Sequence, residues 1–99
     1  MPAESKFERQ LIAELEEQYP GAVILKNNPH FIQGIPDRLI LFEDRWAAFD
    51  AKANAGSPRR PNQSYYIKLL DRMSYAKFVY PENAEEFLHE LQQALRPRR

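Results

Sequence analysis

Apolar residues recur at helical spacing near the start of the chain, with polar residues between them. Over residues 5–18 this pattern predicts a helix, and Tyr19-Pro20-Gly21 would end it because Pro and Gly both break helices. The apolar positions of this helix are Phe7, Leu11, Ile12 and Leu15.

Three short runs of β-forming residues follow, at residues 22–26, 37–42 and 46–52. Only the polar Glu43-Asp44-Arg45 separates the last two, so we expect them to pair as a hairpin. Residues 27–36 are rich in Asn, Pro and Gly, which favour turns, and are predicted to form a loop.

The second half of the chain predicts a helix over residues 61–74, a strand over 75–80 and a final helix capped by Asn83. Glu86 stands three residues after Asn83, the spacing of a capping box. The tail at 96–99 is expected to be loose. The apolar stripe of the final helix consists of Phe87, Leu88, Leu91 and Leu95.

The predicted order is therefore αβββαβα within a single domain of residues 1–99. The fourth strand follows a helix, so it should join the sheet by a crossover connection. The expected α/β fold is one mixed central sheet flanked by helices. A core of this size is marginal, which favours pairing into a symmetric homodimer. Four aromatic residues are expected in the core: Trp46, Tyr65, Tyr66 and Tyr75.

Composition narrows the classes of function. The chain has no cysteine, which excludes disulfides and thiolate metal sites and favours the cytoplasm. It also has no apolar run long enough to span a membrane and no apolar stretch like that of a signal peptide in the first residues.

The net charge of zero conceals an asymmetry between the two halves of the chain. Residues 1–50 carry 5 Lys and Arg against 9 Asp and Glu, and residues 51–99 carry 9 against 5. A basic second half suits contacts with phosphate, although an ordinary solvated surface would look the same.

Charged residues on the third predicted strand are the strongest sign of chemistry. Alternation places Asp50 and Lys52 on one strand face, where a purely structural strand would not carry charge. Asp37 opens the preceding strand, and the hairpin would bring it beside Asp50. Two carboxylates suit Mg²⁺ or Mn²⁺, and a nearby lysine can stabilise the charge of a phosphate.

These residues resemble a known family. Pro36-Asp37 followed by Asp50-Ala51-Lys52 is similar to the PD-(D/E)XK nuclease signature. Gly34-Ile35-Pro36-Asp37-Arg38-Leu39-Ile40 and Arg60-Pro61-Asn62-Gln63 resemble its virus-type replication-repair branch, VRR-Nuc, as a phage-like stand-alone domain. Two positions depart from the family: Asp50 stands where Glu is usual, and Ile67 stands where some relatives have Tyr.

The resemblance implies a restriction-endonuclease-like core and a Mg²⁺- or Mn²⁺-dependent endonuclease that hydrolyses phosphodiester bonds in DNA. It further suggests branched DNA, such as a Holliday junction or a flap, in a bacterium or a phage-infected cell. Asp37, Asp50 and Glu8 would bind the metal, Lys52 would stabilise charge or position water, and Gln63 would orient the site.

Several of these residues could instead have a purely structural role. Glu8 lies three residues after Ser5, as in a capping box, and Glu4 could take its place at the metal. The alternative role of Gln63 is to satisfy backbone groups at a helix start. The DNA-contact candidates Arg59, Arg60 and Lys26, and the loop residue His30, could be merely solvated.

Two rival functions remain open on the sequence alone. The first is a non-catalytic DNA-binding module that retains the nuclease fold, although such a module has no need of clustered carboxylates near phosphate. The second is an interaction protein with a charged sheet edge, which would bind neither metal nor DNA.

Overall fold

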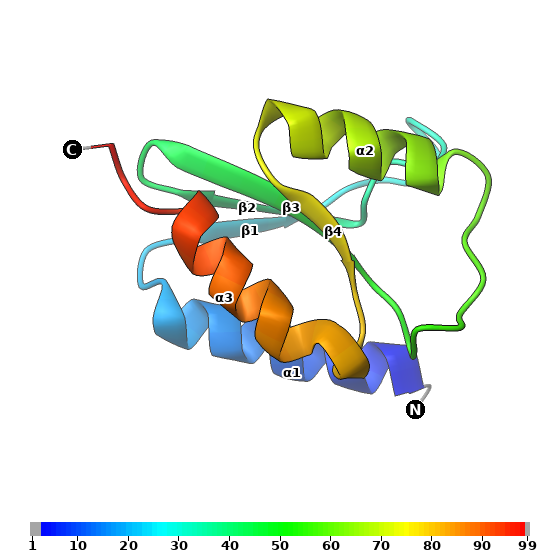
Figure 1. Ribbon diagram of the computed structural model, residues 1–99, viewed down its shortest axis with the longest axis horizontal. Coiled ribbons are helices and arrows are strands. Elements are labelled where there is room, and N and C mark those ends of the chain that lie inside the picture. The colour runs from blue at the N-terminus through cyan, green and yellow to red at the C-terminus, as the bar shows by residue number, and fades with distance from the viewer. Residues whose placement is uncertain (1–2, 99) are drawn as a thin grey trace.

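The computed structural model describes residues 3–98, which form an α/β fold with a four-stranded mixed sheet and three α-helices (Figure 1). The predicted order αβββαβα is confirmed, and element ends differ from the predicted ones by one or two residues. None of the described helices is long and apolar enough to cross a membrane. The elements are α1 (Ala3–Gln18), β1 (Val23–Lys26), β2 (Arg38–Phe42), β3 (Arg45–Ala51), α2 (Gln63–Met73), β4 (Ala76–Val79), the 3-10 turn η1 (Pro81–Asn83) and α3 (Ala84–Ala94).

The strands lie in the order β1-β2-β3-β4. β2 pairs antiparallel with both β1 and β3, whereas β3 and β4 are parallel. The predicted hairpin and the predicted crossover through α2 are therefore both confirmed. In the hairpin Arg38 lies opposite Phe49, so the start of β2 is beside the end of β3.

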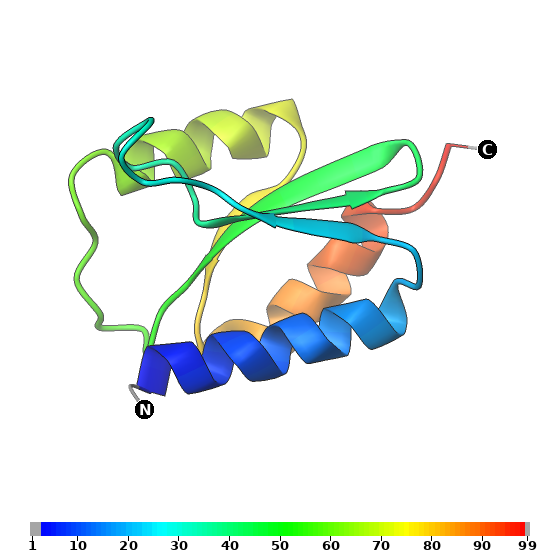
Figure 2. The same ribbon diagram turned by 180° about the vertical axis from the view of Figure 1, so that it is seen from behind.

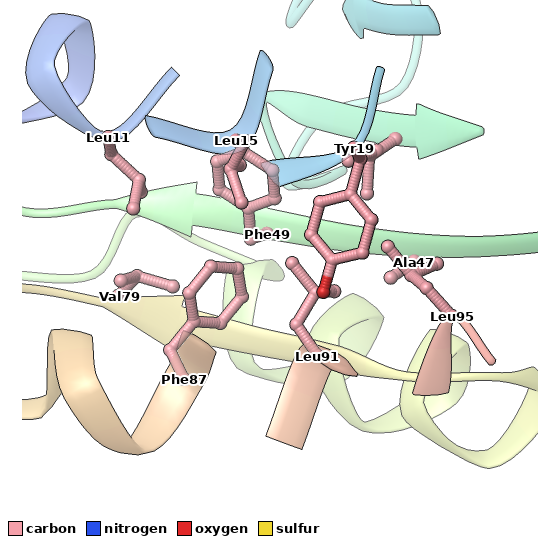
Figure 3. Close-up of a cluster of buried hydrophobic side chains, with 10 residues drawn as sticks. Leu11, Leu15, Tyr19, Ala47, Phe49, Val79, Phe87, Leu91 and Leu95 are labelled. Carbon is pink, nitrogen blue, oxygen red and sulfur yellow. The ribbon is translucent and has the colours of Figure 1, made fainter. Parts of the chain in front are cut away.

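Helices cover both faces of the sheet. α1 and α3 lie on one face and α2 lies on the other (Figures 1 and 2). Between the sheet and the helices α1 and α3 lies the core, shown in Figure 3, where the rings of Phe49 and Phe87 are 5.3 Å apart. Truncation of either ring would cost about 3–5 kcal/mol. The buried cluster comprises Leu11, Leu15, Tyr19, Ile40, Ala47, Phe49, Val79, Phe87, Leu91 and Leu95.

The helix α2 contacts β3 and β4, so β3 is covered on both faces. Its residues from Ala47 to Ala51 are all buried. β1 forms an edge of the sheet, and its apolar residues Val23 and Leu25 remain exposed, as does Leu41 of β2. A charged side chain among these buried residues of β3 must therefore find its partners within the protein.

Three local predictions are wrong. α2 begins at Gln63 rather than at Pro61, because Asn62 adopts a left-handed conformation with φ 70°. Asn83 makes no side-chain cap for α3, since its side chain bonds the Tyr80 N–H and the Phe78 carbonyl instead. Tyr65 is 60% exposed and does not belong to the core.

The loop between β1 and β2 is fixed at its base and along its length. The Asn27 side chain donates to the Pro36 carbonyl at 2.8 Å, and its backbone N–H donates to the Asp37 carbonyl at 2.7 Å. Gly34 has φ +93° and packs so closely on Asn62 that a Cβ would lie 2.6 Å from the Asn62 Cβ. A glycine is therefore required where this loop meets the start of α2.

We predict that Gly34→Ala destabilises the protein more than Gly21→Ala does. Both glycines have positive φ, and alanine in such a conformation costs about 1–2 kcal/mol. At Gly34 overpacking against Asn62 adds about 1–3 kcal/mol, whereas nothing lies within 4 Å of a Cβ at Gly21. Urea unfolding of both variants would measure the difference, and equal losses would show that the close approach is unimportant.

Candidate functional site

The site begins with two charged residues at the end of β3. Asp50 and the adjoining Lys52 face α2, while Phe49 packs into the core on the opposite face of the strand. The predicted sharing of one strand face is confirmed by an ion pair between Lys52 Nζ and Asp50 Oδ2 at 3.1 Å. Both residues are buried, and Asp50 is only 1% exposed.

Gln63, the first residue of α2, completes a closed ring with this pair. Its Nε2 donates to Asp50 Oδ2 at 3.1 Å, and its Oε1 accepts from Lys52 Nζ at 2.9 Å. The same Oε1 accepts the Arg60 N–H at 2.7 Å, so Gln63 also satisfies backbone before α2. Asp50, Lys52 and Gln63 form what we call the buried triad, in which the charges and the amide satisfy one another.

The remaining oxygen of Asp50 holds the start of β2. Asp50 Oδ1 accepts the backbone N–H of Asp37 at 3.1 Å. The expectation that the hairpin brings Asp37 beside Asp50 is thus confirmed. The Asp50 carboxylate is occupied on both oxygens, and one of its tasks is to fix the position of Asp37.

The Asp37 side chain has very different surroundings. Among the described residues 3–98, no donor hydrogen-bonds its carboxylate. Burial raises the pKa of Asp37, and the negative charges of Asp50 and Glu8 raise it further, against the opposing charges of Arg60 and Lys26. Asp37 is a half-buried carboxylate whose negative charge is disfavoured and which still has both oxygens available.

A cavity of about 410 Å³ opens at Asp37. The loop between β1 and β2 forms one wall, and the segment from Arg60 to Gln63 forms another. Asp50 and Lys52 do not line this cavity, but Gln63 does and lies in contact with both. The lining residues are Pro29, His30, Gln33, Gly34, Ile35, Asp37, Arg60, Pro61 and Gln63.

Glu8 of α1 lies near this site without lining the cavity. Its Oε2 pairs with Arg38 Nε at 3.1 Å, and both side chains are largely buried. Ser5 lies inside α1, so the capping-box reading of Glu8 is wrong and the carboxylate faces the sheet. Its charge raises the pKa of Asp37, which places Glu8 within electrostatic range of the site.

The three cationic candidates for DNA contact occupy different positions. The Arg59 guanidinium lies over the ring of Phe78 at 4.2 Å, and Lys52 Nζ lies 5.8 Å from the centre of the same ring. Arg60 lines the cavity. Lys26 ends β1 opposite Arg38 in the sheet, and its charge acts on Asp37. Arg59, Arg60 and Lys26 are all exposed to solvent.

Two contributors to the site were not predicted from the sequence. Arg38 pairs with Glu8, and Phe78 lies beneath both Lys52 and Arg59. His30, which the sequence left open between a DNA contact and a solvated residue, lines the cavity. Arg38 follows Asp37 directly, which was a usable signal, since a cation at that position faces the first helix. Phe78 could be recognised only from the parallel register in which it lies opposite Asp50.

A hard divalent cation at this cavity would rely on Asp37, whose two oxygens are available. Within residues 3–98 no group of three or more His, Cys, Asp or Glu side chains is arranged to hold a metal. Mg²⁺ is commonly held by one or two carboxylates, with water and phosphate supplying the other ligands. Asp37, free of donors and beside Asp50, matches that arrangement.

We predict that Asp37→Asn stabilises the metal-free protein at neutral pH. The folded-state pKa of Asp37 lies above its usual value of 3.8, so stability is lost progressively as the pH rises above 3.8, and the loss is complete above the folded-state pKa. Below pH 3.8 the group is protonated in both states and the advantage should vanish. Urea unfolding with EDTA from pH 7 downward would measure this.

Glu90→Gln is the control, and its expected effect on stability is opposite in sign to that of Asp37→Asn. The Tyr75 hydroxyl donates to Glu90 at 2.7 Å, and this bond, together with that from Lys77, lowers the pKa of Glu90 below 4.5. Its contribution to stability is present above pH 4.5 and is lost as the pH falls through the lowered pKa, so Glu90→Gln should destabilise at neutral pH. A stability loss for Asp37→Asn at pH 7 would contradict the electrostatic picture of the cavity.

Comparison with known proteins adds no family to this geometry. Protein-family models, curated proteins and solved structures gave no match to the chain. The conclusions about function therefore depend on the positions of Asp37 and the buried triad.

Proposed function

We propose that this protein is a metal-dependent DNA endonuclease with a restriction-endonuclease-like core, similar to the VRR-Nuc branch of the PD-(D/E)XK nucleases. The observation that carries the proposal is the contrast between two adjacent carboxylates. Asp50 is saturated by Lys52, Gln63 and the Asp37 N–H, while the Asp37 carboxylate lies open at a cavity.

Asp37 would hold the divalent cation. Asp50 would act as the second carboxylate only by exchanging one of its present hydrogen bonds for the cation. Burial and the negative charges of Asp50 and Glu8 raise the pKa of Asp37, and a bound cation would offset both effects. When bound, Mg²⁺ or Mn²⁺ supplies a Lewis acid for the phosphate and a water of lowered pKa. Glu8 would add negative charge from α1 while Arg38 keeps its carboxylate in place.

Lys52 would stabilise the negative charge that builds on the phosphate during cleavage. Its ammonium does not reach the cavity directly but donates a hydrogen bond to Gln63, which lines the cavity. The ammonium is paired with Asp50, so the field that reaches the cavity wall is that of an ion pair, and burial leaves this field little screened by water or salt. Asp50 and Gln63 hold the ammonium in place before substrate arrives, which is the arrangement that favours a transition state over a ground state.

The substrate that suits this site is a phosphodiester backbone. Arg60 stands in the cavity wall, and the exposed Arg59 and Lys26 offer further cations near the same edge of the sheet. Such contacts suit phosphate without reading base sequence. Action on branched DNA and assembly as a homodimer remain predictions from the sequence.

Cleavage by the Asp37→Asn protein provides the direct test. The wild type should cut linear, flapped or four-way DNA with Mg²⁺ or Mn²⁺ and should not cut in EDTA. Asp37→Asn should remain folded and yet lose cleavage, because the amide keeps the shape of the side chain and removes its charge. Mn²⁺ should also raise the melting temperature of the wild type and leave that of Asp37→Asn unchanged.

Asp44→Asn, at the exposed turn of the hairpin, is the matched control and should cut normally. DNA binding by the wild type without cleavage under any metal would favour the non-catalytic binding module. Absence of both metal and DNA binding would favour an interaction protein. Normal cleavage by folded Asp37→Asn would falsify the assignment of this carboxylate.

Lys52→Met should reduce the chemical step while leaving DNA binding nearly intact. Loss of one preorganised charge typically costs about 10²–10³-fold in rate. The variant leaves Asp50 buried without its cation, which would destabilise by about 3–5 kcal/mol. The double variant Asp50→Asn with Lys52→Met removes both charges, and it should recover stability but not cleavage.

Single-turnover cleavage, measured on protein shown to be folded by circular dichroism, separates the two effects. Lys77→Met is the control, because Lys77 of β4 forms ion pairs with Glu86 and Glu90 of α3, and none of the three lines the cavity. Cleavage near the wild-type rate by folded Lys52→Met would mean that the lysine only neutralises Asp50.

A further inference from the structure

Phe31 is the most exposed large apolar side chain in the described part of the chain, at 86%. It lies in the loop between β1 and β2, directly after His30, which lines the cavity. Single exposed apolar residues are ordinary on protein surfaces. Two further features distinguish Phe31: its loop is held by hydrogen bonds, and the loop adjoins the cavity.

The loop presents Phe31 on a folded support. The His30 N–H donates to the Asn28 side chain at 2.8 Å, and the Phe31 N–H donates to the Asn28 carbonyl at 3.2 Å. Beyond Phe31, the Ile35 N–H donates to the Ile32 carbonyl and Gly34 packs on Asn62. Figures 1 and 2 both show this loop against the start of α2. The aromatic ring therefore stands between two turns of an anchored loop.

The chemistry around Phe31 is that of a nucleotide contact. The cavity beside its loop is lined by Arg60, which could bind a phosphate, and by Asp37 and Gln63. A volume of about 410 Å³ lies within the range of small-ligand pockets. Phe31 does not itself line the cavity, but its loop does so through His30, on a cavity that Arg60 also lines. Exposed aromatic rings combined with basic residues are what unpaired bases stack on in proteins that bind single strands.

We propose that Phe31 stacks on an unpaired nucleotide next to the scissile phosphate and so makes the site select DNA that has unpaired bases at the cut. The ring of Phe31 has a free face for a base, whereas paired bases in a duplex are already stacked on their neighbours. The proposal rests on the proposed nuclease function, because it assigns the substrate preference of that same site. Phe31 is thus a specificity-determining residue outside the Asp37 and Lys52 chemistry.

Binding in EDTA tests this preference without cleavage. The probes are a fully paired duplex and the same duplex with a single-stranded extension carrying 2-aminopurine at the first unpaired position. The wild type should bind the extended DNA more tightly and quench the 2-aminopurine. Stacking on one base is worth about 1–3 kcal/mol, so Phe31→Leu should weaken binding of the extended DNA roughly 5- to 150-fold and abolish quenching.

The variants are chosen to separate stacking from apolar contact and from folding. Phe31→Leu keeps an apolar side chain without a ring, and Phe31→Tyr restores the ring and should restore both signals. Met73→Ala removes another exposed apolar residue, at the far end of α2, and should change neither signal. Affinity for the paired duplex should be the same for all four proteins, since phosphate contacts dominate it.

The outcomes distinguish this proposal from the proposed function. If Phe31→Leu retains the preference and the quenching while Asp37-dependent cleavage is present, the stacking assignment is overturned and the nuclease stands. If the ring-dependent preference is present and no metal supports cleavage, the stacking assignment holds for a binding module and the nuclease fails. If the wild type binds neither DNA, both are overturned.

Discussion

The buried charge of Asp50 is the constraint that determines how the segments at one end of the sheet are arranged. β3 is covered on both faces, so its carboxylate depends on partners supplied by the protein. Lys52, Gln63 and the Asp37 N–H provide them from three different segments. A buried ion pair contributes little net stability compared with apolar residues of similar volume, but losing one partner is costly. The pair therefore fixes geometry more than it adds stability, which is what a preorganised site requires.

Two neighbouring carboxylates thereby acquire different characters from their surroundings. Both oxygens of Asp50 accept hydrogen bonds that position other groups, whereas no donor bonds the Asp37 carboxylate within residues 3–98, and it lines a cavity. The cost of this arrangement falls on the folded protein, since burial and the charges of Asp50 and Glu8 oppose ionisation of Asp37. Residues that lower stability in this way are characteristic of sites where activity and stability conflict.

The sequence predicts those features that depend on short-range periodicity. Alternation along β3 was sufficient to place Asp50 and Lys52 together, and the hairpin was sufficient to bring Asp37 to them. It could not predict that α2 starts late, because the left-handed Asn62 is tied to Gly34, which lies far away in the sequence. The partner of Glu8 could not be predicted for the same reason, because Arg38 lies 30 residues away. Asn83 was mispredicted for a local reason, since its side chain bonds the Tyr80 N–H and the Phe78 carbonyl just before it. The exposure of Tyr65 depends on which side of α2 packs against the sheet.

Sheet topology explains why these features meet at one end of the sheet. β3 and β4 are parallel, so both finish at the same end of the sheet, and the antiparallel β2 starts at that end. The three connections at this end are the loop before Asp37, the segment from Lys52 to Asn62, and η1, whose Glu82 accepts the Ala55 N–H. The opposite end of the sheet carries the short turn of the hairpin. The long connections are therefore gathered at the end of the sheet where β3 and β4 finish. In open α/β sheets ligands bind outside the carboxyl ends of the strands. Because the loops are pinned to each other and to Asp50, a cavity can persist between them without collapsing.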